Sequence, residues 1–273
     1  IQSIHLLGGE PFVRKDIIKI IKKITDSGIF CYISTNGTLI DQKIAEDLSL
    51  IENLSIDISL DGVCPNAHDT FRGVAGTFNK VINALEFLNE NNVNINVTSV
   101  LGTHNISDIK ELVELAVKNN AKRIQFLTFS TTGRGGQIDK ELGFKVDDIP
   151  EIKKKCIELI LSYLDKIYID VPFMGLSPLS FRLYEILNFQ GFNNYYDLLL
   201  GCNAGLTKMV IDASGKVMLC PQVRKGFGNL RNIEFIKAWQ IINRYAKNNL
   251  LCSNKDCKYL PFCGGKCRIP NIE

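Results

Sequence analysis

The alternation of strand-like and helix-like segments over the first 172 residues is the feature that most constrains the fold of this chain. Short apolar runs rich in Ile and Val alternate with segments whose apolar residues recur at helical spacing. Strands that alternate with helices in this way predict βαβ units and a parallel sheet. The expected strands cover 4–8, 29–34, 54–60, 93–101, 123–129 and 166–173, and the expected helices cover 14–28, 42–48, a stretch from 77 onward, 107–120 and 149–164.

The order of these segments favours a βα barrel, complete or partial, over a Rossmann sheet, because no G-x-G-x-x-G motif opens any expected helix. After Pro172 the regular alternation gives way to short strands, glycines and cysteines, so we place a domain boundary near residue 175. The expected fold is therefore α/β, with a partial TIM-like barrel over 1–175 and a small cysteine-rich α+β domain over 176–273.

Length, charge and hydropathy exclude several classes of protein. The 273 residues suffice for one large domain, or for a large and a small one. The net charge is +3, and lysines are interleaved with acids, so no basic block indicates a nucleic-acid partner. No apolar run reaches membrane-spanning length, and no signal peptide opens the chain. We expect a cytoplasmic protein without a nucleic-acid or membrane partner.

The nine cysteines are distributed unevenly. Cys31, Cys64 and Cys156 lie apart, and we expect them to be inert because buried free cysteine is common. Clustered cysteines in an intracellular chain favour a metal over disulfides. Soft thiolates at these spacings suit either structural zinc or iron–sulfur ligation, and the C-terminal stretch alone does not decide between them. The clustered cysteines are Cys202, Cys220, Cys252, Cys257, Cys263 and Cys267.

Polar residues follow one expected strand after another. In a βα barrel, functional groups gather at the carboxyl ends of the strands. One polar turn is ordinary turn chemistry, but several in succession predict a ring of groups around a small polar ligand. Gly8 and Gly9 let a ligand approach the backbone closely, Glu10 can accept from an ammonium group, and Arg72 can pair with a carboxylate. The side chains suited to bonding hydroxyl groups or a carboxylate are Ser34, Asn36, Ser59 and Asp61.

The strand-end motifs "GGEP", "STNGT", "SLDG", "HDTFRGVAGTF" and "TTGRG", in this order, resemble those of the radical S-adenosylmethionine (SAM) superfamily over essentially the whole chain. The resemblance implies that the GGEP-type turn binds the methionyl amino group of SAM. It also implies that the next strand ends bind ribose and carboxylate, and that two later residues touch the adenine. The implied SAM-binding residues are Gly8, Gly9, Glu10, Pro11, Ser34, Asn36, Ser59, Asp61 and Arg72, with Val100 and Leu127 at the adenine.

The clustered cysteines, with the spacing Cys-x12-Gly-x4-Cys before Cys-x4-Cys-x5-Cys-x3-Cys, resemble the SPASM extension of the same superfamily, which holds auxiliary [4Fe–4S] clusters. The resemblance assigns one cluster to Cys202, Cys220 and Cys267 and a second cluster to the other three cysteines. Two departures bear on the second cluster. Four residues rather than two separate Cys252 from Cys257, and no further cysteine follows Cys267.

The superfamily holds its SAM-cleaving cluster on a Cys-x3-Cys-x2-Cys loop before the GGEP strand, and no such triplet occurs in this sequence. We therefore expect the barrel to lack its first unit and the chain alone to be inactive in SAM cleavage. The three histidines, His5, His68 and His104, are expected to be structural or exposed rather than ligands.

For the intact protein the resemblance implies a maturase. A 5′-deoxyadenosyl radical would abstract hydrogen from a ribosomally made peptide or protein, leaving a thioether or carbon–carbon crosslink or a related oxidation. Ferredoxin or flavodoxin would supply the electrons. Two alternatives remain: a tetrapyrrole-modifying radical SAM enzyme, and a non-catalytic module that binds SAM or a peptide and carries iron–sulfur clusters for electron transfer.

Overall fold

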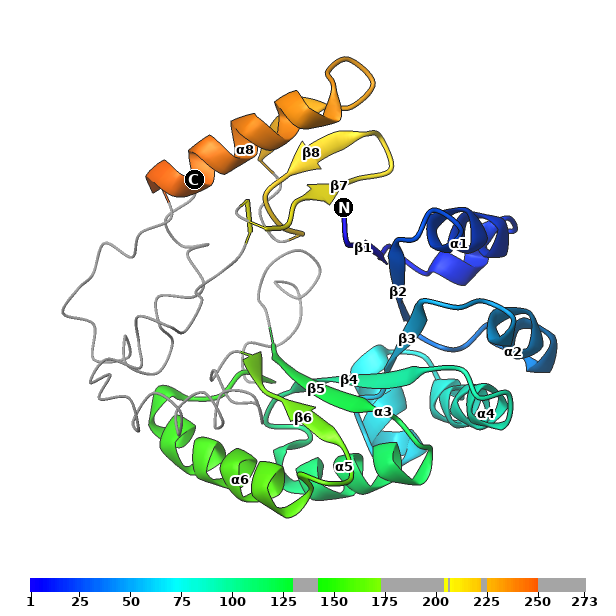
Figure 1. The fold of residues 1–273 in the computed structure, drawn as a ribbon. Helices are drawn as coiled ribbons and strands as arrows, with labels where there is room; N and C mark the ends of the chain where they lie inside the picture. Colours follow the sequence, from blue (N-terminus) through cyan, green and yellow to red (C-terminus); the bar gives the residue numbers. More distant parts are fainter. Residues whose placement is uncertain (130–141, 173–203, 206, 222–224, 250–273) are drawn as a thin grey trace. The chain divides into compact units, whose positions relative to one another are not determined.

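The computed structural model describes residues 1–129, 142–172, 204–205, 207–221 and 225–249 (Figure 1). These residues fall into two compact units, the first ending at Pro172 and the second beginning at Ala204. The domain boundary expected near residue 175 lies outside the described residues. Each unit is therefore described by itself.

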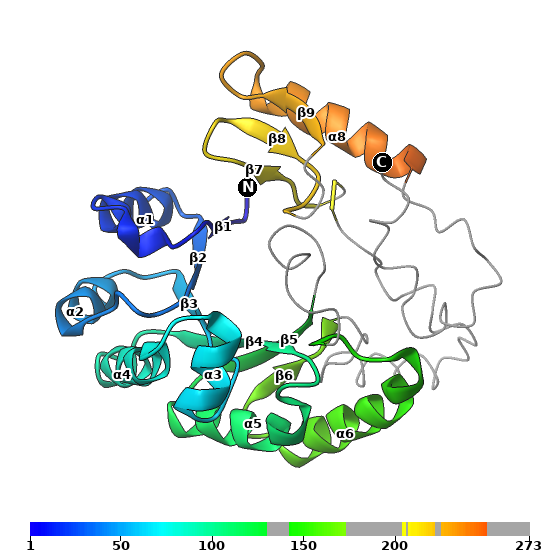
Figure 2. The same cartoon turned by 180° about the vertical axis from the view of Figure 1, so that it is seen from behind.

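The first unit is built on a six-stranded parallel sheet in which every strand pairs with the next one along the chain. The helices lie along one side of this curved sheet (Figures 1 and 2). This arrangement is the partial TIM-like barrel that the βα alternation predicted. The strands are β1 (Ser3–Leu6), β2 (Phe30–Thr35), β3 (Leu54–Ser59), β4 (Ile95–Leu101), β5 (Arg123–Thr128) and β6 (Tyr168–Asp170).

The helices occupy the expected segments, with one addition. Helix α3 (Pro65–Arg72) was not expected, because its mostly polar sequence carries no apolar periodicity. It ends at Gly73, whose φ of 71° is the left-handed conformation that favours glycine after a helix. The other α-helices are α1 (Ile17–Thr25), α2 (Gln42–Ser49), α4 (Thr77–Glu90), α5 (Ile109–Lys118) and α6 (Ile149–Ser162), and short 3₁₀ turns are η1 (Pro11–Val13), η2 (Ile106–Asp108) and η5 (Val146–Asp148).

Helix α4 begins at Thr77, as the sequence predicted, and the side chain that caps it comes from outside the helix. The cap position is Gly76, and the capping carboxylate comes from Asp69 of α3. Asp69 accepts hydrogen bonds from the backbone N–H of Gly76 (2.6 Å) and of Phe78 (2.7 Å), and from the Thr77 hydroxyl (2.7 Å). One side chain thus satisfies several donors at the start of α4 and fixes the turn between α3 and α4.

The two faces of the sheet differ in chemistry. Side chains alternate between the faces along each strand. One set is buried and apolar, and it faces the helices: Ile58 lies with Val81 and Ala84 of α4 around Gly37. The other set is polar, although strands of a parallel sheet are usually apolar on both faces. The polar face carries His5, Ser34, Ser55, Asp57, Asn96, Arg123 and Gln125.

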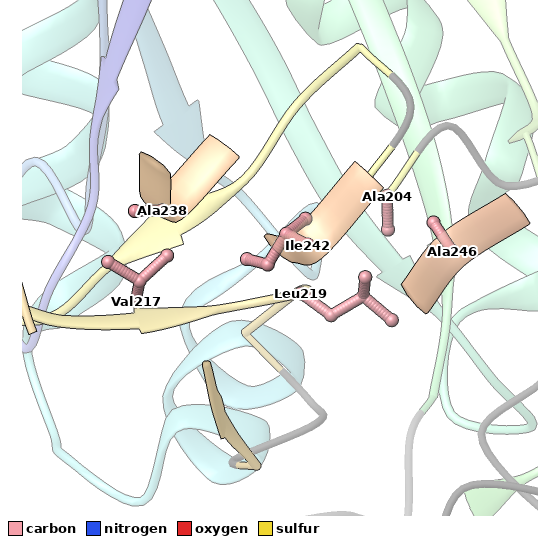
Figure 3. Packing of buried hydrophobic residues seen from close by; sticks show 6 residues of the cluster. All are labelled: Ala204, Val217, Leu219, Ala238, Ile242 and Ala246. Atoms are coloured by element: carbon pink, nitrogen blue, oxygen red, sulfur yellow. The ribbon is translucent and has the colours of Figure 1, made fainter. Parts of the chain in front are cut away.

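The second unit combines the antiparallel sheet β7 (Val210–Ile211), β8 (Lys216–Met218) and β9 (Gly226–Asn229) with helix α8 (Phe235–Asn249). Its described core places one face of α8 against β8 and the residues beside it (Figure 3). The half-buried Cys220 packs against this core. The core consists of Ala204, Val217, Leu219, Ala238, Ile242 and Ala246.

Candidate functional site

Glu10, which follows β1, joins the carboxyl ends of the first two strands. Its Oε1 accepts hydrogen bonds from the Thr35 hydroxyl (2.7 Å) and from the backbone N–H of Phe12 (3.1 Å). Its Oε2 accepts from the backbone N–H of Asn36 (2.8 Å). The sequence predicted an acceptor for an ammonium group at this position. The structure shows a carboxylate that holds the strand ends together and lies at the N-cap of η1, which begins at Pro11.

Gly8 and Gly9 form an exposed bend between β1 and Glu10. A Cβ built on either glycine meets no atom within 4 Å, and neither residue has a left-handed φ. Within the part of the chain that the structure describes, neither the backbone conformation nor the packing therefore requires glycine at these positions. Close approach of a ligand to the backbone would require it.

The turn after β2 is closed by its own side chains. Asn36 Oδ1 accepts from the backbone N–H and the hydroxyl of Thr38 (2.9 and 2.7 Å). The Thr35 hydroxyl accepts from the backbone N–H of Gly37 (3.0 Å), whose φ is 74°. Asn36 is half-buried, and its side-chain oxygen is used within the turn.

Asp61, just after β3, is fully buried and connects three segments. Its Oδ2 accepts from Arg72 Nε (2.6 Å) and lies 2.5 Å from Arg72 Nη2. Its Oδ1 accepts from the backbone N–H of Val100 (2.7 Å), and its main-chain carbonyl accepts from the Asn105 amide (3.1 Å). Both carboxylate oxygens therefore hold neighbouring groups of the same site.

The other predicted site residues lie at the same edge of the sheet. Ser59 ends β3 and is half-buried, and Leu127 of β5 is 37 % exposed. Val100 and Leu127 are register partners on β4 and β5. The structure thus brings Glu10 into contact with Asn36, and Asp61 into contact with Arg72 and Val100.

Sequence reasoning missed a hydrogen-bond network on the polar face of the sheet. Its residues lie within the strands, before their carboxyl ends. At its centre lies Asp57, which is 3 % exposed. Asp57 Oδ1 accepts from the Asn96 amide (2.8 Å) and from Arg123 Nη2 (3.2 Å), and its Oδ2 lies 3.4 Å from His5 Nε2. Burial alone would raise the pKa of Asp57, but hydrogen bonds from His5 and Asn96 and the charge of Arg123 lower it. Two features of the sequence could have indicated this network: the charged Asp57 inside a strand, and His5 in a strand two places earlier.

The remaining two histidines are packed against the Asp61 region. His68 is buried in α3, where its Nδ1 accepts from the backbone N–H of Asp61 (3.1 Å), and burial lowers its pKa. His104 stacks on Phe71, with ring centroids 4.2 Å apart, and burial lowers its pKa as well. Both rings are therefore neutral packing groups near neutral pH.

Most of the predicted cluster ligands, namely Cys202, Cys252, Cys257, Cys263 and Cys267, lie outside the described residues. Among the residues that are described, no group of three or more His, Cys, Asp or Glu is placed to hold a metal ion. Burial raises the pKa of Cys31 to about 11 and that of Cys156 to about 12, whereas Cys64 is exposed. None of the helices in the described ranges has the length and apolar character needed to cross a membrane.

Comparison with known families gives a match to the Radical SAM superfamily over residues 1–116. The AdoMet-dependent heme synthase of Methanosarcina barkeri is 25% identical over 277 residues, which cover 96% of this chain and 76% of the relative. The mycofactocin maturase MftC of Mycolicibacterium smegmatis is 26% identical over 219 residues, which cover 80% of this chain and 52% of the relative.

Solved structures give the same fold. SuiB of Streptococcus suis bound to S-adenosylmethionine superposes with a TM-score of 0.73 at 21% identity, covering 98% of this chain. SuiB bound to its precursor peptide SuiA superposes with a TM-score of 0.74, also at 21% identity. The present chain spans about three fifths of the SuiB chain, 62% in the first of these structures.

Proposed function

We propose that this chain, which carries a radical SAM domain in residues 1–116, binds S-adenosylmethionine at the carboxyl edge of β1–β5. The observation that carries the proposal is the bend at Gly8 and Gly9. Its backbone is open to a ligand, and a Cβ would meet nothing of the described protein there. Backbone C=O groups of the bend and the neighbouring Glu10 carboxylate are acceptors that suit the amino group of an amino-acid ligand.

The other groups of the edge fit the remaining parts of the same ligand. The Arg72 side chain is 31 % exposed and fixed by Asp61, so it offers a positioned cation for the carboxylate. Ser34, Asn36 and Ser59 offer hydroxyl and amide groups for the ribose. Val100 and Leu127 offer half-exposed apolar surface for the adenine. When bound and cleaved by reduction, SAM supplies the radical that takes hydrogen from the substrate.

Asp61 has a different role in this proposal from the one that the sequence suggested. Because its carboxylate is fully buried and both oxygens are engaged, it acts through Arg72 and the Val100 backbone. Glu10 similarly combines ligand binding with support of the turn after β2.

The clustered cysteines are proposed to hold [4Fe–4S] clusters in a SPASM-type domain over 176–273, with the barrel domain over 1–175. The spacing of the thiolates and the presence of a radical SAM domain in the same chain support iron–sulfur ligation over zinc. Cys202, Cys220 and Cys267 are assigned to one cluster, and Cys252, Cys257 and Cys263 to another.

The proposed activity is hydrogen abstraction from a ribosomally made peptide or protein, with ferredoxin or flavodoxin as the electron donor. The maturase MftC as a relative and the peptide-bound form of SuiB support this substrate class. A second candidate is a tetrapyrrole substrate, because the alignment with the heme synthase spans 96% of this chain.

Anaerobically reconstituted protein tests both levels of the proposal. The chain should bind SAM, measured by calorimetry, and should yield no 5′-deoxyadenosine above background with a strong reductant, because it contains no Cys-x3-Cys-x2-Cys triplet. Absence of SAM binding would refute the proposed function. Titration with Fe-coproporphyrin III, the tetrapyrrole named in a further relative that is 26% identical over 290 residues, the Fe-coproporphyrin III synthase of Methanosarcina barkeri, then separates the substrate classes. Tight binding, followed in the Soret region, favours the tetrapyrrole enzyme, and no binding favours the peptide maturase.

A further inference from the structure

The His5 side chain of β1 reaches across β2 and contacts two residues of the polar face. Its Nε2 lies 2.8 Å from Ser34 Oγ on β2 and 3.4 Å from Asp57 Oδ2 on β3. Ser34 and Asp57 are register partners on the adjacent strands, so a single ring nitrogen faces both residues. The imidazole remains 43 % exposed, whereas Asp57 is almost completely buried.

Asp57 determines which form of His5 faces Ser34. Its pKa is lowered, and Asn96 and Arg123 hold the carboxylate in place, so it is an anion near neutral pH. An Nε2 lone pair beside the carboxylate would be repelled, whereas an Nε2–H shared with Ser34 Oγ at 2.8 Å is attracted to the carboxylate oxygen at 3.4 Å. The neutral tautomer with hydrogen on Nε2 and the imidazolium ion both satisfy this requirement. Nε2 is therefore a donor in either charge state.

The donor at Nε2 fixes the direction of the Ser34 hydroxyl. Ser34 Oγ accepts the hydrogen bond from His5, so its own proton cannot point at the ring. A hydroxyl that accepts on one side has its single proton available for another acceptor. Ser34 is half-buried and lies at the strand edge that is proposed to hold SAM.

We propose that His5 is a positioning residue that makes Ser34 a hydrogen-bond donor toward an acceptor oxygen of SAM, either a ribose or a carboxylate oxygen. The identity of the ligand rests on the proposed function, whereas the geometry that orients Ser34 belongs to this chain. Arg123, Asp57, His5 and Ser34 form a linked series of polar contacts from β5 to β2, and Ser34 lies one residue before the carboxyl end of β2.

SAM binding in paired variants tests the role of His5. His5→Leu removes the donor and should weaken binding about tenfold, the size expected for one hydrogen bond of about 1.4 kcal/mol. His5→Gln, whose amide nitrogen can replace Nε2–H, should restore binding to within about threefold of wild type. In a Ser34→Ala background, His5→Leu should have no further effect. Ser55→Ala is the matched control, because Ser55 accepts a hydrogen bond from Asn96 in the same network and not from His5. The affinity of Ser55→Ala for SAM should equal that of the wild type.

The proposal would be overturned if His5→Leu bound SAM with wild-type affinity. It would also be overturned if His5→Leu weakened SAM binding equally in the wild-type and Ser34→Ala backgrounds. Should the wild-type chain fail to bind SAM, the proposed function is refuted, and His5 is then judged by nitrogen-15 NMR of histidine-labelled protein. The positioning role is supported if the wild-type chain carries a proton on Nε2 of His5 and if this proton is lost or exchanges in Asp57→Asn. A proton on Nδ1 alone overturns it. The chain has three histidines, so His5→Leu assigns the signal.

Discussion

The guanidinium Nε of Arg72 lies 2.6 Å from Oδ2 of Asp61, at the end of β3. The carboxylate is fully buried, whereas the Arg72 side chain keeps 31 % of its surface exposed. A buried anion thus anchors a cation that still faces solvent. Because the same carboxylate also accepts from the Val100 backbone, the position of Arg72 and the end of β4 depend on one side chain.

Asp61→Asn should destabilise the protein by about 3 kcal/mol, because it leaves Arg72 without its anion and places an amide NH2 against one of the two donors from which Asp61 now accepts. Thermal unfolding followed by circular dichroism should show a melting temperature lower by roughly 6–12 °C. Asp16→Asn is the matched control: Arg14 Nε lies 2.6 Å from Asp16 Oδ1, but both side chains are exposed, so the melting temperature should be almost unchanged. Equal effects of the two variants would contradict the anchoring role of Asp61.

Gly9→Val should lower the affinity for SAM by about tenfold or more, or roughly 1.4 kcal/mol, without lowering the melting temperature. A Cβ at this position meets no described atom within 4 Å, so we expect the added side chain to collide with a bound ligand rather than with the protein. Calorimetric titration measures the affinity. Gly28→Val provides the opposite pattern, because Gly28 has a φ of 72° in the turn after α1: it should cost about 1 kcal/mol of stability and leave the affinity unchanged. Unchanged SAM affinity in Gly9→Val would show that the bend at Gly8 and Gly9 is not part of the SAM site.

The regular part of the fold could be predicted from the sequence because periodicity and turn residues agree. Every expected strand of the barrel is present, since runs such as 54–60 and 93–101 are apolar at the positions that face the helices. Helix α3 could not be predicted in this way. It is held by contacts with residues outside the helix, such as the pairing of Arg72 with Asp61 and the capping of α4 by Asp69.

The sequence could predict where the residues of the candidate site lie along the chain, but not which groups they contact. The strand-end rule placed Glu10, Asn36 and Asp61 at one edge, and in the structure each follows the carboxyl end of a strand, β1, β2 and β3 respectively. It could not show that the Asp61 carboxylate is fully occupied within the protein. It also could not connect His5 with Asp57, because 52 residues separate them in sequence and only the parallel register brings them together.

Asp57→Asn should make the protein less sensitive to acid. A carboxyl group whose pKa is lowered by folding stabilises the native state above its unfolded pKa, about 4, and this contribution is lost as the pH falls below that value. Near pH 7 the variant should therefore melt at a lower temperature than wild type. Between about pH 4 and pH 2 the two melting curves should converge, and a constant difference over this range would show that Asp57 titrates normally.

Cys31 and Cys156 should resist alkylation in the native protein, whereas Cys64 should react. With pKa values of about 11 and about 12, the two buried thiols are ionised at pH 8 to only about one part in 1,000 and one part in 10,000. Peptide mapping after brief treatment with iodoacetamide measures the modification of each cysteine. Denatured protein is the control, in which all three should react equally. Rapid native modification of Cys31 would mean that β2 opens readily.

Cys220→Ala should remove roughly one cluster's worth of iron and sulfide from the anaerobically reconstituted protein, and Cys267→Ala should do the same, because both are assigned to one cluster. Cys220 is half-buried against the core of the second unit. Loss of iron from Cys220→Ala would therefore place the cluster beside that core. Cys64→Ala is the matched control, since Cys64 is exposed in the first unit and should leave the iron content unchanged. Zinc in stoichiometric amount without labile sulfide, after preparation with iron available, would assign these cysteines to a structural zinc site.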